Sequence, residues 1–208
     1  MATRTTPKKM TAEEFFEWLK RPENEGKRCE LEDGEVVEMP SPGEGHAYVC
    51  WLAIKVLTEY VTRRGSGYLL TNDCGLVVRR RPDTVRGPDV MVFLANPTEM
   101  SWKFCEKVPV AIVEVLSPSD TMRQTTIRVG QYLKRGVKLI WVLDPQDRIV
   151  YIHRPEEFGK VLDEAEELTG NGVLPDFSCP VRDLFTLPGQ KPAAPRPTRT
   201  RSRKGNRE

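Results

Sequence analysis

The chain has 208 residues, of which 38% are hydrophobic and 30% charged, and its formal net charge is +2. This length suits one domain with a buried core. Because no run of about 18 apolar residues and no apolar leader occurs, the sequence predicts neither membrane insertion nor secretion, and we expect one soluble, cytoplasmic domain.

The cysteines and histidines limit the kind of metal site that the sequence predicts. The five cysteines stand singly, without a CxxC pair, which argues against a disulfide framework and a structural zinc site and indicates a reducing compartment. His46 and His153 lie far apart in sequence, so a histidine-rich zinc centre is not expected either. Any metal should therefore be held by carboxylate oxygens, which favours Mg²⁺, with Mn²⁺ as an alternative.

The positive charge is concentrated at the end of the chain. Residues 188–208 contain seven Lys or Arg and one Glu, a balance of +6, so the other residues carry −4 within the total of +2. This segment has a composition typical of a disordered basic tail. A mildly acidic body is not typical of a protein whose whole folded surface binds nucleic acid, so a groove or the tail would have to supply the attraction.

The first predicted elements are a short helix and a hairpin. Thr11 and Glu14 form a capping-box pattern ahead of an apolar face that includes Phe15, which predicts a helix over residues 11–19. Strands over residues 28–32 and 35–39 are predicted on either side of Asp33-Gly34, a strong signal for a two-residue turn. Residues 1–9 are expected to be a flexible leader.

The middle of the chain alternates helices and apolar strands. Helical spacing runs from His46 to about Arg63 and ends at Gly65, and a second helical pattern covers residues 119–135 and ends at Gly136. Strands are predicted over residues 68–71, 74–79, 89–94, 108–116, 139–143 and 149–153. We therefore expect an α/β fold with a mixed central sheet and flanking helices, in one domain over residues 10–187.

Two carboxylates are the strongest candidates for a site. Glu114 interrupts an otherwise apolar strand. Burying an unpaired carboxylate costs roughly several kcal/mol of free energy, so Glu114 needs a cation, a metal or a hydrogen-bond donor beside it. Asp89 follows Pro88 at the mouth of another buried strand. If the two strands are neighbours, both residues could hold one divalent ion, with a backbone carbonyl and waters completing the oxygen shell. The alternative is that Glu114 pairs with Arg128 and Asp89 caps a turn.

The order of motifs resembles the Uma2 family, a domain of unknown function with a restriction-endonuclease-like fold. The motifs are ELEDGE at residues 30–35, His46, GPDV at 87–90, VEVLSPS at 113–119, Tyr132, Gly136-Val137 and WVLDP at 141–145. The resemblance implies a PD-(D/E)xK nuclease core in which Asp89 and Glu114 are the metal-binding acids and Glu30 is a further catalytic acid. In that superfamily the carboxylates hold Mg²⁺, which activates water, while a lysine assists.

This sequence departs from the family pattern at the lysine. The residue two positions after Glu114 is Leu116, and the helix position at which Uma2-like proteins supply a lysine is Arg128, four residues before Tyr132. Arginine keeps the charge and binds phosphate in a bidentate manner, but it cannot act as a general base. An acidic residue common four positions earlier is Gln124 here, which removes another charge partner.

Several residues have two interpretations. Gln124, Arg128, Gln131 and Arg135 share one helix face, which would either face the site or be a solvated helix side. His46 either ligates or carries a proton near the acids or simply starts its helix, and Ser117 and Ser119 are expected to cap the following helix. Tyr132 is a further accessory candidate.

The leading hypothesis is an endonuclease that hydrolyses DNA phosphodiester bonds with Mg²⁺, using Glu30, Asp89, Glu114 and Arg128. The alternative is a catalytically impaired nuclease-fold protein that binds nucleic acid or a protein partner. A homodimer is a further open alternative, because nucleases of this fold often pair to cut two strands.

Overall fold

The computed structural model describes residues 9–72, 74–187 and 189. At its centre lies a sheet with the strand order β10-β9-β8-β7-β6-β3, in which β7 and β8 are parallel and the other neighbours antiparallel. The predicted mixed sheet is therefore confirmed. Its strands are β3 (Tyr68–Thr71), β6 (Val90–Phe93), β7 (Ala111–Val115), β8 (Leu139–Asp144), β9 (Ile149–His153) and β10 (Lys160–Leu162).

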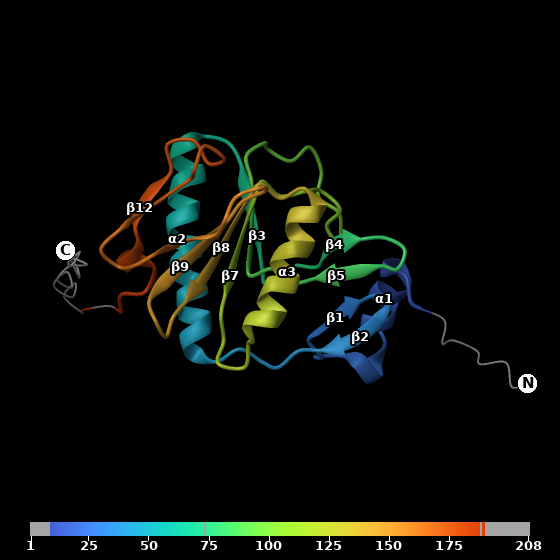
Figure 1. Ribbon diagram of the computed structural model, residues 1–208. Coiled ribbons are helices and arrows are strands. Elements are labelled where there is room, and N and C mark those ends of the chain that lie inside the picture. Colours follow the sequence, from blue (N-terminus) through green and yellow to red (C-terminus); the bar gives the residue numbers. More distant parts are fainter. Residues whose placement is uncertain (1–8, 73, 188, 190–208) are drawn as a thin grey trace, which may run out of the picture.

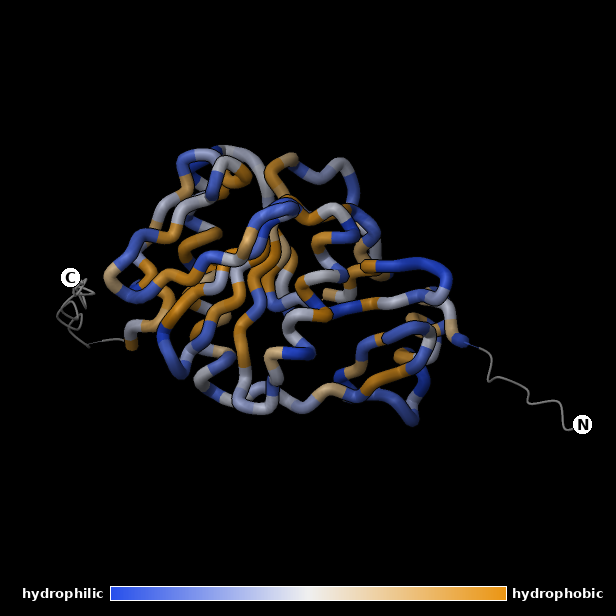
Figure 2. Tube along the Cα trace, viewed as in Figure 1, coloured by the Kyte–Doolittle hydropathy of each residue, from blue (hydrophilic) through white to orange (hydrophobic). Residues whose placement is uncertain are grey.

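Two helices, α2 (Glu44–Arg64) and α3 (Met122–Arg135), lie on opposite faces of this sheet (Figure 1). The central strands are the most hydrophobic part of the chain trace (Figure 2). Because side chains alternate along a strand, Val113 and Val115 join the core beneath α2, whereas Ile112 joins the core beneath α3. Glu114 has the same parity as Ile112, so strand β7 presents this carboxylate to helix α3.

The predicted ends of the two helices agree with the structure better than their predicted starts. Gly65 and Gly136 end α2 and α3 in the left-handed conformation, with φ of 73° and 108°, which glycine adopts without a Cβ clash. Helix α2 begins at Glu44, so His46 lies within its first turn and does not open it. The prediction that Ser117 or Ser119 caps the next helix is wrong.

Thr121 caps helix α3 instead, because its side chain accepts from the Gln124 N–H while the Gln124 side chain accepts from the Thr121 N–H. Ser117 is tied to Asp120, donating from its hydroxyl over 2.8 Å. The polar run before α3 therefore forms a separate turn, which the helical spacing of the sequence could not distinguish from the helix itself.

A smaller sheet with the order β2-β1-β5-β4 packs beside α3 and carries the N-terminal helix α1 (Ala12–Leu19). The predicted hairpin is confirmed, with φ of 53° at Asp33 and 80° at Gly34, as a turn with two positive φ values requires. The capping box of Thr11 and Glu14 is also present. The strands are β1 (Cys29–Glu32), β2 (Glu35–Glu38), β4 (Leu76–Arg79) and β5 (Thr84–Arg86).

Short elements complete the described chain. Strands β11 (Glu167–Thr169) and β12 (Ser178–Pro180) form a hairpin whose neighbour Phe177 packs on Tyr60 of α2 and Trp141 of β8. The 3-10 helices η1 (Pro22–Asn24) and η2 (Val181–Leu184) have no counterpart in the prediction, and neither do β5, β10, β11 and β12. Each of these elements has at most four residues, too few to show a period.

No helix within the described parts of the chain has the length and apolar character needed to cross a bilayer. The predicted leader over residues 1–9 and the predicted tail over residues 188–208 lie outside the described residues, apart from Lys9 and Gly189.

Candidate metal and phosphate site

Asp89 and Glu114 lie at adjacent strand ends. Strands β6 and β7 are antiparallel neighbours, with Val90 opposite Val113, so continuing the register by one residue sets Asp89 opposite Glu114. Both carboxylates line one cleft of about 420 Å³. The strand adjacency on which the proposed pair depends is thus present.

Asp89 is held from two sides. Its Oδ2 accepts a hydrogen bond from the backbone N–H of Val115 over 2.8 Å, and its Oδ1 lies 3.4 Å from Nε2 of His46. The carboxylate therefore bonds to the neighbouring strand and does not cap its own turn. The hydrogen bond to Asp89 raises the pKa of His46, against the lowering effect of burial.

Glu114 lies beneath helix α3 and meets two of its side chains. The Tyr132 hydroxyl donates to Oε1 over 2.5 Å, and Nη1 of Arg128 lies 3.4 Å from Oε2. Burial raises the pKa of Glu114 to about 8, and the charges of Asp89 and Glu30 act in the same direction. Arg128 and the hydrogen bond from Tyr132 oppose that rise.

Glu30 lies behind the cleft wall and does not line the cleft. Its Oε2 accepts from Arg86 over 2.8 Å, and its Oε1 accepts from the backbone N–H of Gly87 over 2.9 Å. Arg128 also reaches it, with Nη2 at 3.4 Å from Oε2. Arg128 thus bridges Glu30 and Glu114, so the ion pair considered as an alternative from the sequence is present together with the cleft.

The helix face of Gln124, Arg128, Gln131 and Arg135 points toward the small sheet and the cleft, and of these four residues Gln124 is exposed while the others are half-buried. Gln131 accepts from Nε of Arg86 over 2.8 Å, and Arg135 donates to the carbonyl oxygens of Val77 and Glu106. Gln124 lines the cleft while its side chain completes the capping box of Thr121. The cleft therefore collects the predicted residues His46, Asp89, Glu114, Gln124 and Arg128, with Glu30 and Tyr132 directly behind them.

The donor set of Asp89 and Glu114 fits a hard divalent cation. Each carboxylate has about four lone-pair positions, and each has two contacts described above, so acceptor capacity remains on both. Glu30 pairs with Arg86 and Arg128, and Glu114 pairs with Arg128, whereas Asp89 lies 3.4 Å from His46 and keeps its negative charge uncompensated while that imidazole is neutral. Oxygen donors with residual negative charge suit Mg²⁺ or Mn²⁺.

Two residues with a structural part in the site were missed from the sequence. Arg86 fixes Glu30 through an ion pair and also lies 2.9 Å from Oε1 of Glu32. Cys50 lies with its Sγ 3.5 Å from Nδ1 of His46. The available signal for Cys50 was its spacing of four residues from His46 on a predicted helix, which brings two side chains to one face.

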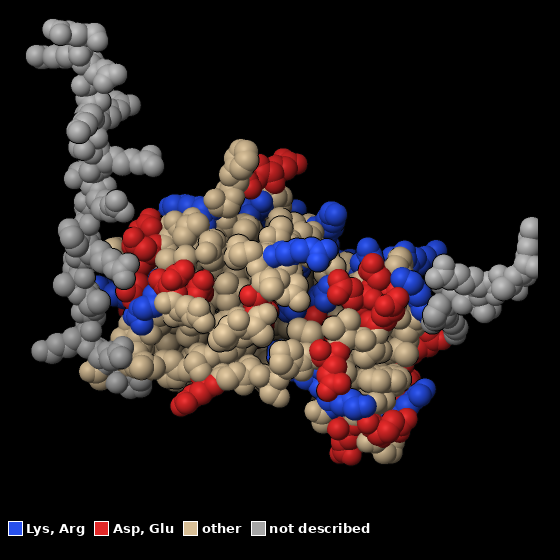
Figure 3. Space-filling view, turned by 60° about the horizontal axis from the view of Figure 1, so that its bottom comes forward, with Lys and Arg blue, Asp and Glu red and all other residues tan. Residues whose placement is uncertain are grey.

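Acidic and basic side chains are interspersed on the face of the molecule that Figure 3 shows, without one broad basic patch. Attraction of a polyanion across this face would therefore be local.

The sequence model of the Uma2 family, described as "Putative restriction endonuclease", matches residues 12–182. Among solved structures, the chain is similar to a protein of Anabaena variabilis ATCC 29413 described as "a putative nuclease belonging to DUF820". The two are 22% identical with a TM-score of 0.69, over 85% of this chain and 97% of that chain. This likeness shows a shared fold. A search of the curated proteins gave no match.

Proposed function

Because this chain belongs to the Uma2 family, whose description is "Putative restriction endonuclease", we propose that it is a Mg²⁺-dependent endonuclease that hydrolyses DNA phosphodiester bonds. The observation that carries the proposal is the pair Asp89 and Glu114 on one cleft at adjacent strand ends. Mn²⁺ would suit the same donors.

Asp89 and Glu114 would hold the ion, with waters filling the remaining positions. When bound, Mg²⁺ supplies a Lewis acid that lowers the pKa of water and neutralises charge on phosphate oxygens. The protein's own part is to fix the two carboxylates. Tyr132 orients Glu114, and the Val115 N–H together with His46 orients Asp89.

Arg128 is the phosphate-binding candidate. Its contacts with Glu30 and Glu114 are both 3.4 Å, longer than the roughly 2.7–2.9 Å of a strong charge-assisted hydrogen bond. A guanidinium held this loosely can turn part of its donor fork toward a phosphate in the cleft. Arg128 cannot accept a proton. His46 is therefore the cleft residue best suited to exchange a proton near neutral pH.

The test is cleavage of mixed-sequence duplex DNA by the purified chain with and without Mg²⁺. Asp89→Asn and Glu114→Gln keep side-chain size and remove the charge, so each should abolish Mg²⁺-dependent cleavage. Glu59→Gln, an exposed carboxylate elsewhere on α2, is the matched control and should cleave normally. Cleavage that persists in both site variants after identical purification would refute the proposal.

A second candidate function rests on Arg128. In place of the expected lysine this arginine pairs with two acids, which suits a nuclease-fold protein that binds nucleic acid or a protein partner without cutting. Such a protein would bind DNA in the absence of divalent ions and give no Mg²⁺ binding heat in calorimetry. The same purified samples therefore separate the two functions.

A further inference from the structure

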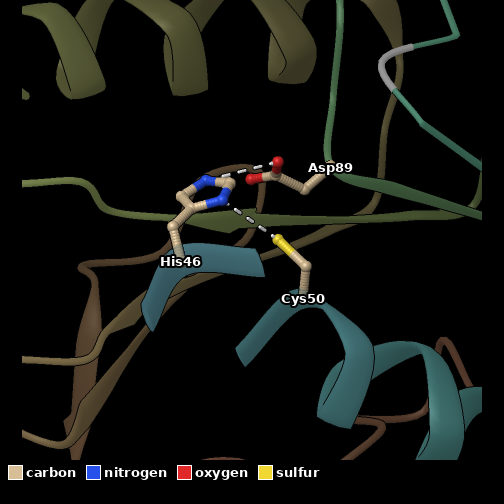
Figure 4. Close-up of side chains that lie close together, drawn as sticks. All are labelled: His46, Cys50 and Asp89. Atoms are coloured by element: carbon tan, nitrogen blue, oxygen red, sulfur yellow. Dashed lines mark hydrogen bonds and ion pairs between the residues drawn. The ribbon is translucent and has the colours of Figure 1, made fainter. Parts of the chain in front are cut away.

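One sulfur, one nitrogen and one carboxylate donor converge beside the cleft (Figure 4). His46 and Cys50 are four residues apart on α2 and share a face, and Asp89 reaches them from the start of β6. Donor atoms of all three lie within 4.8 Å of one another, and within the described ranges this is the one group of at least three such residues.

The donor atoms of this group lie close to, but not yet at, the spacing of ligands around a tetrahedral ion. Bonds of about 2.0 to 2.3 Å from zinc to nitrogen, oxygen and sulfur, at tetrahedral angles, separate neighbouring ligands by about 3.4 to 3.6 Å. Sγ of Cys50 is 3.5 Å from Nδ1 of His46, and Oδ1 of Asp89 is 3.4 Å from Nε2. The two contacts use different ring nitrogens, so one ion would require the His46 ring to turn until a single nitrogen faces both Sγ of Cys50 and the Asp89 carboxylate.

The ligand chemistry differs from that of the Asp89 and Glu114 pair. Thiolate and imidazole are soft or borderline donors that favour zinc and related transition ions, whereas Mg²⁺ prefers carboxylates and water. Catalytic zinc sites also have three protein ligands and a fourth position that is open to water. The absence of a CxxC pair in the sequence does not exclude such a zinc site, because the third donor, Asp89, comes from a distant strand.

A role for Cys50 as a nucleophile fits the structure less well. His46 and Asp89 line the cleft, but Cys50 does not and packs against the core beneath α2. A substrate in the cleft would meet the imidazole and the carboxylate first. A small ion that enters between them can still reach the sulfur.

We infer that His46, Cys50 and Asp89 bind a divalent transition ion of the zinc type, and that this ion competes with Mg²⁺ for Asp89. The competition rests on the proposed function, because Asp89 would serve both ions. The binding of the transition ion does not rest on it. Zinc would then act as an inhibitor of a Mg²⁺-dependent activity.

The binding half is tested with Co²⁺, whose bond to a thiolate gives a charge-transfer absorption band. The full chain, freed of metals, is titrated with Co²⁺ and then with Zn²⁺ in competition. Cys74→Ser is the matched control, because Cys74 is also half-buried but outside the group. The wild type and Cys74→Ser should give the band, Cys50→Ser should lack it, and Zn²⁺ should displace it.

His46→Gln provides a second variant that keeps the thiol and should weaken Co²⁺ binding at least about tenfold. Circular dichroism and thermal unfolding identify any variant that has not folded. An unchanged band in folded Cys50→Ser, or no band in the wild type, overturns the site.

The competition half is tested by cleavage. Added Zn²⁺ should raise the Mg²⁺ concentration needed for half-maximal cleavage in the wild type and in Cys74→Ser, and should do so much less in Cys50→Ser. An active wild type that binds Zn²⁺ without any change in its Mg²⁺ requirement overturns the competition. A chain that shows the cobalt band but cleaves nothing contradicts the proposed function and leaves the metal site supported.

Discussion

The hydroxyl of Tyr132 lies 2.5 Å from Oε1 of Glu114, and both side chains are buried between β7 and α3. The tyrosine O–H and the Arg128 guanidinium are the donors that meet this carboxylate in the described structure. The helix therefore supplies polar contacts for a group that the apolar strand would otherwise leave isolated.

Tyr132→Phe should lower the free energy of unfolding by about 1–3 kcal/mol, since it leaves a buried acceptor with one donor fewer. Urea unfolding measures the change. Tyr60→Phe is the matched control, because the buried Tyr60 hydroxyl has no hydrogen-bond partner among the described residues. Its removal should be nearly neutral. Equal losses in both variants would show that the space filled by the hydroxyl, and not its bond to Glu114, is responsible.

Stability should also depend on pH through Glu114. Its pKa is raised by burial from 4.5 to about 8, so between these values the folded chain holds a proton that the unfolded chain has lost. The stability of the metal-free protein should therefore fall as pH rises across this interval. His46 has a raised pKa and adds a slope of the same sign, so Glu114→Gln is needed to isolate the glutamate.

Unfolding midpoints of the wild type and Glu114→Gln, measured in urea over that pH interval, give the difference. The variant should show the shallower slope. Added Mg²⁺ should flatten the wild-type slope, because an ion bound to Glu114 keeps the carboxylate ionised. Parallel slopes for the two proteins would mean that Glu114 is already ionised in the folded chain near neutral pH.

Substitution of Arg128 tests whether cleavage needs the lysine that the family pattern leads us to expect at this position. Arg128→Lys keeps the charge and introduces an amine that can exchange a proton, so we expect cleavage to rise at least about tenfold. Arg128→Met removes the cation between Glu30 and Glu114 and should reduce both cleavage and stability, the latter by about 1–3 kcal/mol. A slower Arg128→Lys enzyme would indicate that the site depends on the bidentate guanidinium.

The sequence pattern singles out a candidate residue where that residue contradicts its surroundings. Glu114 stands in an apolar strand, and Asp89 follows Gly87-Pro88 at a strand mouth, so both were visible from local pattern alone. Their adjacency needed the pairing of β6 with β7, which the sequence could only assume. The family resemblance supplied the order of motifs but not the contacts.

The missed features depend on contacts between distant residues. Strand β5 has three residues. The role of its Arg86 can be recognised only from the contacts with Glu30 and Gln131, which lie on other elements. In the sequence Cys50 is an ordinary helix residue. Its place in a donor group follows only from the fold, which sets Asp89 beside His46. Such constellations carry no periodicity, so propensity and spacing do not reveal them.

The basic segment over residues 188–208 should contribute to DNA affinity through charge. With seven Lys or Arg and one Glu, its removal changes the net charge from +2 to −4. Because each neutralised phosphate adds about 0.9 to the slope of log affinity against log salt, truncation after Leu187 should flatten that slope and weaken binding at low salt. Fluorescence anisotropy with a labelled duplex, in a salt series without divalent ions, measures both.

The truncated chain retains every described helix and strand, so it should stay folded and should still cleave when DNA is present at high concentration. That outcome would assign the tail to recruitment and the cleft to chemistry. A chain with the tail's seven Lys and Arg replaced by Gln serves as the control for length. If this control binds like the wild type, charge is not what the segment provides, and the local cations of the cleft, with Arg128 first, must carry the attraction.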